Sequence, residues 1–249
     1  MAFRTITGAI NKRNVIRSFI NLRSAQSTAT DCNENSSKTH FGFETVDEKE
    51  KWKRVHDVFE TVAEKYDVMN DAMSFGIHRV WKDIFINRLA PTHGTKLLDV
   101  AGGTGYTKES TGVEINWLCG DAEKLPVPDE SYTAYTIAFG IRNCTHIDKV
   151  LEEAYRVLAP GGRFLCLEFS HLTNDPMQWV YDQYSFQVIP VLGQLIAGQW
   201  KPYQYLVESI RQFPDQEKFK WMIEEAGFRQ VTYENLTFGV CAIHSGFKI

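Results

Sequence analysis

Lys96-Leu-Leu-Asp-Val-Ala-Gly-Gly-Thr-Gly105 sets the architecture that we expect for this chain. Its apolar run, from Leu97 to Ala101, is interrupted only by Asp99 and is followed by glycines. Such a run predicts a buried parallel strand that ends in a tight turn. Glycine has no Cβ and tolerates positive φ, so a ligand can lie against bare backbone at this turn. Because open α/β sheets bind ligands beyond the carboxyl ends of their strands, we expect an α/β fold with a ligand site after Ala101.

The order of the glycines limits which ligand this turn can hold. A dinucleotide fingerprint needs G-x-G-x-x-G, and Lys108 stands where the third glycine would follow Gly103 and Gly105. The acidic D-x-A-G-G-T-G form instead resembles motif I of class I S-adenosylmethionine methyltransferases, whose loop faces a cationic methionine moiety. On the loop alone, another nucleotide and a glycine-rich turn without a ligand stay open as alternatives.

Charge and cysteine usage limit the partners of this chain. The 249 residues contain 27 bases and 31 acids, and the formal net charge is -4. Because residues 1–30 carry five bases and no acid, the remainder is more acidic than this total. An acidic body argues against a nucleic-acid partner, since phosphate binding needs a basic face. The five cysteines form no C-x-x-C pair, which indicates reduced thiols and no metal site.

The first 45 residues differ from the rest in composition. Residues 1–30 contain arginines, serines and apolar residues but no carboxylate, which predicts a mitochondrial transit peptide; a disordered basic tail is the alternative. Residues 31–45 are mostly small and polar, and we interpret them as a flexible linker before a domain over residues 46–249. No apolar run approaches the roughly 18 residues of a membrane span.

Apolar spacing predicts alternating strands and helices in this domain. Helices are expected over residues 47–66, 80–89, 147–158 and 215–226. Strands are expected at residues 97–101, 114–119, 134–139 and 163–169, with a hairpin of residues 230–235 and 241–248. The aromatic and methionine-rich segments, including Tyr181 to Trp200, would either form a channel for an apolar ligand or pack as ordinary core.

Together the motifs resemble one family, the C-methyltransferases of ubiquinone and menaquinone biosynthesis. The resemblance runs from about residue 46 to the end. Its motifs are Tyr66-Asp-x-x-Asn70, the glycine-rich loop, Gly120-Asp-Ala-Glu123, Phe139-Gly-Ile-Arg-Asn143, Arg156-Val-Leu-x-Pro-Gly-Gly162, Leu167-Glu-Phe-Ser170 and Tyr184-Ser-Phe186. The resemblance implies a class I S-adenosylmethionine-dependent methyltransferase with a Rossmann-like sheet.

One part of the family pattern is missing. In the family a helix, a second strand with a terminal carboxylate for the cofactor ribose, and a further helix follow the glycine-rich loop. Here only Tyr106 to Val113 separate that loop from the next apolar run, fewer than the roughly 10–12 residues of a parallel crossover. We therefore expect a sheet that lacks the second strand and its flanking helices, with an internal truncation between residues 106 and 114.

The resemblance also implies the residues of a site. The cofactor, S-adenosyl-L-methionine, would be bound by Asp99, Gly102, Gly103, Thr104, Gly105, Asp121 and Ala122, without a metal. Arg142 would face a ring hydroxyl of the substrate, while Tyr66 and Asn143 would orient the ring. A structural salt bridge is the alternative for Arg142. We interpret Glu168 as a buried core partner and His78 as a structural histidine.

The activity implied by the resemblance is C-methylation of a polyprenyl benzoquinol ring in ubiquinone biosynthesis. It would take place at the matrix side of the mitochondrial inner membrane, on a peripheral protein that belongs to a multi-subunit complex with other ubiquinone-biosynthesis proteins. The alternative is a catalytically impaired isoform that serves as an interaction subunit of this complex. Binding of S-adenosylmethionine distinguishes the two hypotheses.

Overall fold

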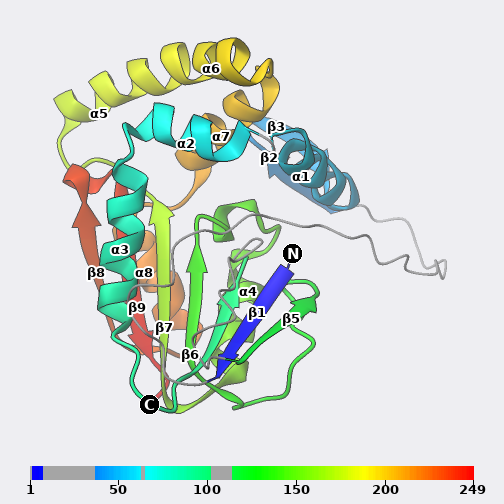
Figure 1. Cartoon of the computed structure of the whole chain (residues 1–249), viewed down its shortest axis with the longest axis vertical. Helices are drawn as coiled ribbons and strands as arrows, with labels where there is room; N and C mark the ends of the chain where they lie inside the picture. Colours follow the sequence, from blue (N-terminus) through cyan, green and yellow to red (C-terminus); the bar gives the residue numbers. More distant parts are fainter. Residues whose placement is uncertain (1, 8–36, 63–64, 102–113) are drawn as a thin grey trace.

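A seven-stranded sheet lies at the centre of the protein (Figure 1). The computed structural model describes residues 2–7, 37–62, 65–101 and 114–249. The strands of this sheet are β1 (Ala2–Thr7), β4 (Lys96–Val100), β5 (Glu114–Cys119), β6 (Tyr132–Ala138), β7 (Leu158–Phe169), β8 (Arg229–Leu236) and β9 (Cys241–Phe247). Their order in the sheet is β5-β1-β4-β6-β7-β9-β8.

Three parallel strands form the middle of the sheet and confirm the predicted first, third and fourth strands. β4 pairs parallel with β6, and β6 pairs parallel with β7. Their apolar residues alternate between the two faces. Leu97 packs with Trp81 and Phe85 on one face, whereas Leu98 belongs to the larger core on the other. This burial on both faces explains why β4 reads as a continuous apolar run.

Helices cover both faces of the sheet. α3 (Ile77–Leu89) supplies Trp81 and Phe85 to the smaller core. α4 (Ile147–Val157) and α8 (Gln216–Glu225) pack on the opposite face, where Leu151, Phe219 and Phe228 are completely buried. The helices predicted over residues 147–158 and 215–226 are therefore confirmed.

The strand between β4 and β5 was not expected from the sequence. β1 pairs antiparallel with β4, where Phe3 lies opposite Val100, and antiparallel with β5, where Phe3 lies opposite Leu118. It occupies the position at which we expected the sheet to lack a strand. Residues 8–30 of the expected transit peptide, and the loop 102–113 that contains the expected truncation, lie outside the described residues.

The structure also differs from the flexible linker expected over residues 31–45. β2 (Lys38–Phe41) and β3 (Glu44–Asp47) form an antiparallel hairpin. The ring of Phe41 stacks on that of Tyr205 with their centroids 4.2 Å apart, and the backbone N–H of Phe43 donates to Glu208 at 3.0 Å. These contacts hold the hairpin against a helix far away in the sequence, which its local composition does not reveal.

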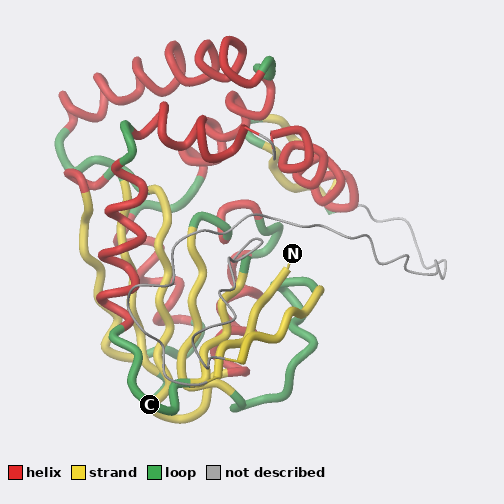
Figure 2. The backbone as a smooth tube through the Cα atoms, in the orientation of Figure 1, coloured by secondary structure: helices red, strands yellow, loops and turns green. Residues whose placement is uncertain are grey.

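A second layer of helices stands over the carboxyl ends of the parallel strands (Figure 2). Its helices are α1 (Glu48–Val62), α2 (Tyr66–Ser74), α5 (Asp175–Gln183), α6 (Ile189–Leu192) and α7 (Lys201–Gln212). A π-helical turn at Tyr184–Val188 joins α5 to α6, and a second at Gly193–Ala197 continues this run beyond α6. This layer has a core of its own, which includes Val62, Met69 and Val207.

Two further properties follow from these elements. Within the described residues, no helix is long and apolar enough to cross a membrane. None of the described cysteines forms a disulfide: Cys144, Cys166 and Cys241 are buried, and Cys119 is exposed.

His146 joins the helical layer to the sheet. Its Nδ1 lies 2.7 Å from a carboxylate oxygen of Glu123, and its Nε2 lies 3.1 Å from a carboxylate oxygen of Glu48 at the start of α1. The other oxygen of Glu123 accepts from the backbone N–H groups of Thr145 and His146. The hydrogen bond to Glu123 raises the pKa of His146 above its ordinary value.

We expect this junction to make stability depend on pH. Because the pKa of His146 is raised in the folded state, its contribution is complete below the unfolded pKa of about 6.5 and is lost as pH rises through the folded pKa. At pH 5.5, His146→Gln should lower the free energy of unfolding by roughly 1 kcal/mol. At pH 8.5 the loss should be much smaller, as measured by urea unfolding at both values. An equal loss at both values would contradict a charged bridge.

Candidate active site

The turn after β6 carries Arg142 to the edge of the sheet. β6 ends at Ala138, and Ile141–Asn143 form a short 3₁₀ turn. Gly140 makes this turn possible, because a Cβ at this position would lie 2.6 Å from the Cβ of Ala101. The ends of β4 and β6 therefore approach each other closely, which places Ala101 and Arg142 at the same sheet edge.

Arg142 and Glu168 form a buried ion pair. Arg142 Nη1 lies 2.7 Å from Glu168 Oε1 and also donates to the carbonyl oxygen of Phe139 at 2.8 Å. The side chains of Arg142 and Glu168 are only 6% and 1% exposed. Burial opposes the charge of Arg142, but Glu168 holds the pKa of this guanidinium above its ordinary value. Arg142 is therefore a permanent cation with a fixed position.

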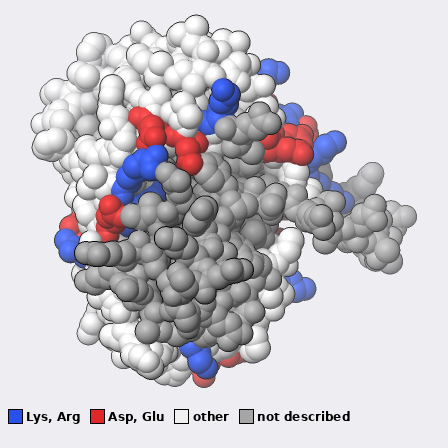
Figure 3. Space-filling model, viewed as in Figure 1, with Lys and Arg blue, Asp and Glu red and all other residues white. Residues whose placement is uncertain are grey.

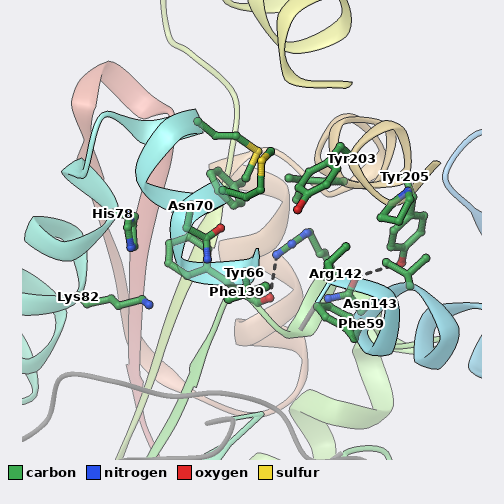
Figure 4. A pocket seen from close by; sticks show the side chains of 17 residues that line it. Phe59, Tyr66, Asn70, His78, Lys82, Phe139, Arg142, Asn143, Tyr203 and Tyr205 are labelled. Atoms are coloured by element: carbon green, nitrogen blue, oxygen red, sulfur yellow. Dashed lines mark hydrogen bonds between the residues drawn. The ribbon is translucent and has the colours of Figure 1, made fainter. Parts of the chain in front are cut away.

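The cation lies in the wall of an apolar cavity between the sheet edge and the helical layer (Figure 4). Its volume is about 80 Å³, several times the space that one water needs. Apolar side chains from α1, α2 and α7 form most of the wall. They include Val58, Phe59, Val62, Met69, Met73 and Leu206. The methionine-rich segment thus contributes Met69 and Met73, whereas none of the lining residues lies within Tyr181 to Trp200. Ile189 of that segment packs in the core of the helical layer, which fits the alternative of ordinary core packing.

The structure brings Tyr66 and Asn143 to the same cavity as Arg142. Burial raises the pKa of Tyr66, although the charge of Arg142 opposes this shift. The phenol therefore keeps its proton at neutral pH. Asn143 Oδ1 accepts a hydrogen bond from the hydroxyl of Tyr205 at 3.0 Å, which fixes the amide. The predicted catalytic residues thus form one group.

Sequence reasoning left several polar side chains of the wall out of the predicted site, among them His78 and Lys82. His78 Nδ1 lies 2.8 Å from Ser74 Oγ, and burial lowers the pKa of both His78 and Lys82. Figure 4 shows both on the side of the cavity away from Tyr205. Their spacing of four residues, on one face of a helix before the glycine-rich turn, was the available signal.

Glu168 was also left out of the predicted site. The available signal was its position near the carboxyl end of the fourth predicted strand, at the edge where ligands bind. The interpretation as a buried partner is confirmed, but the partner is Arg142 itself.

The predicted cofactor residues are only partly described. Asp99 is buried in β4 and accepts a hydrogen bond from the hydroxyl of Thr136 at 2.8 Å. Asp121 follows β5 and is exposed, with Oδ1 accepting from the backbone N–H of Glu123 at 3.1 Å. Ala122 is buried in the larger core. Gly102, Gly103, Thr104 and Gly105 lie outside the described residues.

These strand ends fit S-adenosyl-L-methionine. Asp121 presents an exposed carboxylate beyond β5, where it can accept hydrogen bonds from a ligand. Asp99 adds a carboxylate near the end of β4, three residues before the first glycine of the motif in the sequence, and a carboxylate suits a cationic sulfonium. The exposed carboxylate of Asp121 therefore suits the hydrogen-bonding groups of this cofactor, and the buried carboxylate of Asp99 suits its positive charge.

This α/β sheet, with acidic residues at strand ends beside an apolar cavity, has the architecture of a class I S-adenosylmethionine-dependent methyltransferase. A family model described as "ubiE/COQ5 methyltransferase family" matches residues 45–110 and 106–248. The chain belongs to this ubiE/COQ5 methyltransferase family, whose cofactor is S-adenosyl-L-methionine.

Two proteins with high sequence identity agree with this assignment. The chain is 56% identical to a Drosophila melanogaster protein over 96% of this chain and 95% of that protein. It is 50% identical to a Homo sapiens protein over 86% of this chain and 85% of that protein. Both are named 2-methoxy-6-polyprenyl-1,4-benzoquinol methylase, mitochondrial. A solved Thermotoga maritima S-adenosylmethionine-dependent methyltransferase, 19% identical, covers 53% of this chain and 63% of its own, with a TM-score of 0.38.

We expect the ion pair to be essential for stability. Glu168→Gln leaves the buried guanidinium without a charged partner, which should lower the free energy of unfolding by about 3 kcal/mol in urea. The matched control is Glu234→Gln, which breaks the exposed pair with Arg88 and should cost less than about 1 kcal/mol. In a double variant, Arg142→Met with Glu168→Leu, much of the loss should be recovered. Equal losses in Glu168→Gln and Glu234→Gln would contradict the assigned role of Glu168.

Proposed function

We propose that this protein methylates a ring carbon of a polyprenyl benzoquinol in ubiquinone biosynthesis. The observation that carries the proposal is the fixed cation of Arg142 in the wall of an apolar cavity, next to the sheet edge that fits the cofactor. Two relatives with this name, each at least 50% identical over most of the chain, support the substrate class. Family membership favours the enzyme over the non-catalytic interaction subunit.

When bound, S-adenosyl-L-methionine supplies a methyl group on a sulfonium, which needs an aligned nucleophile about 3 to 3.5 Å away. The residues of this chain prepare that nucleophile. A benzoquinol ring carbon becomes more nucleophilic as a ring hydroxyl loses its proton. Arginine does not readily release its own proton, so we assign Arg142 to stabilise the developing phenolate or to hold the water that accepts the proton.

Tyr66 and Asn143 are assigned to orient the ring. Tyr66 keeps its proton because burial raises its pKa, so its hydroxyl can donate to a ring oxygen. Asn143 Oδ1 already accepts from Tyr205, which leaves the amide N–H₂ available as a donor. The apolar wall that includes Val62, Met69 and Leu206 accommodates the start of the polyprenyl tail.

Arg142→Lys keeps a positive charge but loses the planar fork of donors. We expect kcat to fall by about 100-fold, while the affinity for S-adenosyl-L-methionine stays within about threefold of the parent. Methyl transfer to a short-tailed benzoquinol and calorimetric titration measure the two quantities. Arg88→Lys, in an exposed pair, is the control and should leave both unchanged.

Two results would contradict the proposal. An unchanged kcat in Arg142→Lys would remove Arg142 from the reaction. Failure of the parent chain to bind S-adenosyl-L-methionine would favour the interaction subunit, because that role requires surfaces but no cofactor.

We also propose that the protein is peripheral on the matrix side of the mitochondrial inner membrane, with residues 1–30 as the transit peptide before the catalytic domain of residues 46–249. The relatives are named mitochondrial, which supports the compartment. An apolar cap on the outside of the α5–α6 run supports membrane contact. We define it by Trp179, Val180, Phe186, Val191 and Leu195, which are all exposed. Figure 3 shows the top of the molecule, over this run, mostly without charged residues.

Exposed tryptophan and leucine on a surface with few charges are suited to the boundary between lipid headgroups and acyl chains. The proposed association with other ubiquinone-biosynthesis proteins in a multi-subunit complex has a separate candidate surface around Phe75, which is 88% exposed at the turn between α2 and α3.

The membrane proposal predicts that the cap binds lipid. Trp179→Ser combined with Leu195→Ser should weaken binding to phosphatidylcholine vesicles by at least about tenfold, since each buried apolar side chain contributes about 1.5–3 kcal/mol. Co-sedimentation measures the partition. Trp221→Ser is the control, because Trp221 is also an exposed tryptophan but lies on α8. Equal weakening by the control would contradict a specific role for the cap.

A further inference from the structure

β4 and β5 lie on the two sides of β1, and the gap between them is one strand wide. Because β1 is antiparallel to both, β4 and β5 run parallel to each other. Adjacent strands lie about 4.8 Å apart, so β4 and β5 are separated by roughly 10 Å. At this distance they cannot hydrogen-bond to each other. Without β1, both would present a row of unpaired backbone groups.

The chain is shorter than its relatives at this point in the sequence. The family model matches in two pieces, residues 45–110 and 106–248, which meet within the loop that connects β4 to β5. The alignment with the Drosophila melanogaster relative extends over 285 positions, more than the 249 residues of this chain. The relatives therefore have residues that this chain lacks.

We propose that β4 and β5 form an acceptor site for one extended peptide strand, and that residues 2–7 occupy this site in place of residues that the relatives carry after the glycine-rich turn. The ligand class is a short extended peptide held by main-chain hydrogen bonds on both of its edges. Phe3, Thr5, Ile6 and Thr7 have the β-branched or aromatic side chains that favour strands.

The register shows how much of the sheet this segment completes. Residues 3–7 pair with residues 96–100 of β4, and residues 2–7 pair with residues 114–119 of β5. Residues 96–100 include Asp99 and come directly before the segment with the glycine-rich turn in the sequence. Removal of the N-terminal segment, as in processing of a transit peptide, therefore opens the sheet beside the cofactor edge and leaves the site free for an added peptide.

The test uses the full chain, a variant that lacks residues 2–7, and a fluorescent peptide with the sequence of residues 2–7. Deletion should lower the hydrogen-exchange protection of residues 96–100 and 114–119 by at least about tenfold, because their amides lose partners. The peptide should bind the deletion variant at least about tenfold more tightly than the full chain, whose site is occupied. A peptide with Thr5→Pro should not bind, since proline removes a donor inside the strand.

A full-length Thr5→Pro variant keeps the test decisive if the deletion variant does not fold. In this variant the hydrogen-exchange protection of residues 96–100 and 114–119 should be lower than in the parent. Thr28→Pro, a matched substitution outside residues 2–7, should leave this protection unchanged. Unchanged protection after deletion or in Thr5→Pro would overturn the proposal, and so would equal binding of the peptide to both chains. None of these measurements involves cofactor or methyl transfer, so their outcome is independent of the proposed function.

Discussion

The ion pair of Arg142 and Glu168 is the interaction on which the arrangement of the site depends. Neither charge is stable alone in an apolar interior, because water no longer solvates it. Each therefore fixes the other, and with them the turn after β6 and the end of β7. The pair also fixes a charge in the wall of the cavity, beside neutral polar side chains such as Tyr66 and Asn143. One electrostatic requirement thus determines both backbone geometry and chemical character.

The cavity exists because the protein has separate cores above and below it. The two cores that flank the sheet contain Leu97 and Leu98 on opposite faces, while the helical layer is held together around Met69 and Val207. Lys51 and His146 attach the layer to the turn after β6: Lys51 Nζ donates to the carbonyl oxygen of Cys144 at 2.9 Å. These polar junctions and the apolar cores hold the helical layer and the sheet on the two sides of the cavity.

The sequence was sufficient where structure depends on local pattern. β4, β6 and α4 have the continuous or periodic apolar residues that tertiary packing requires, and they were predicted with nearly correct bounds. The same reasoning failed for β1 and for the β2–β3 hairpin, because their partners are distant in sequence and their own composition is that of a leader and a linker. Whether these two segments form strands depends on the elements that they pack or pair with as much as on their own residues.

Part of the candidate site was also accessible from the sequence. Tyr66, Arg142 and Asn143 do meet at one cavity, as the motifs implied. A salt bridge was the stated alternative for Arg142, and the structure shows one. Its partner Glu168 was not predicted, because a carboxylate at a strand end can face either a ligand or a neighbouring turn. The choice depends on the close approach of Ala101 and Gly140, which positions the turn.

The distribution of cysteines makes the protein selective towards thiol reagents. Burial raises the pKa of Cys144 to about 12 and raises the pKa values of Cys166 and Cys241 as well. These three sulfurs are therefore poor nucleophiles and inaccessible. Among the described residues only Cys119 is exposed, and it lies opposite Ala2 at the end of β5. In this part of the chain, a single alkylating label would attach beside the junction of the N-terminal strand, where its fluorescence would report on whether that strand is in place.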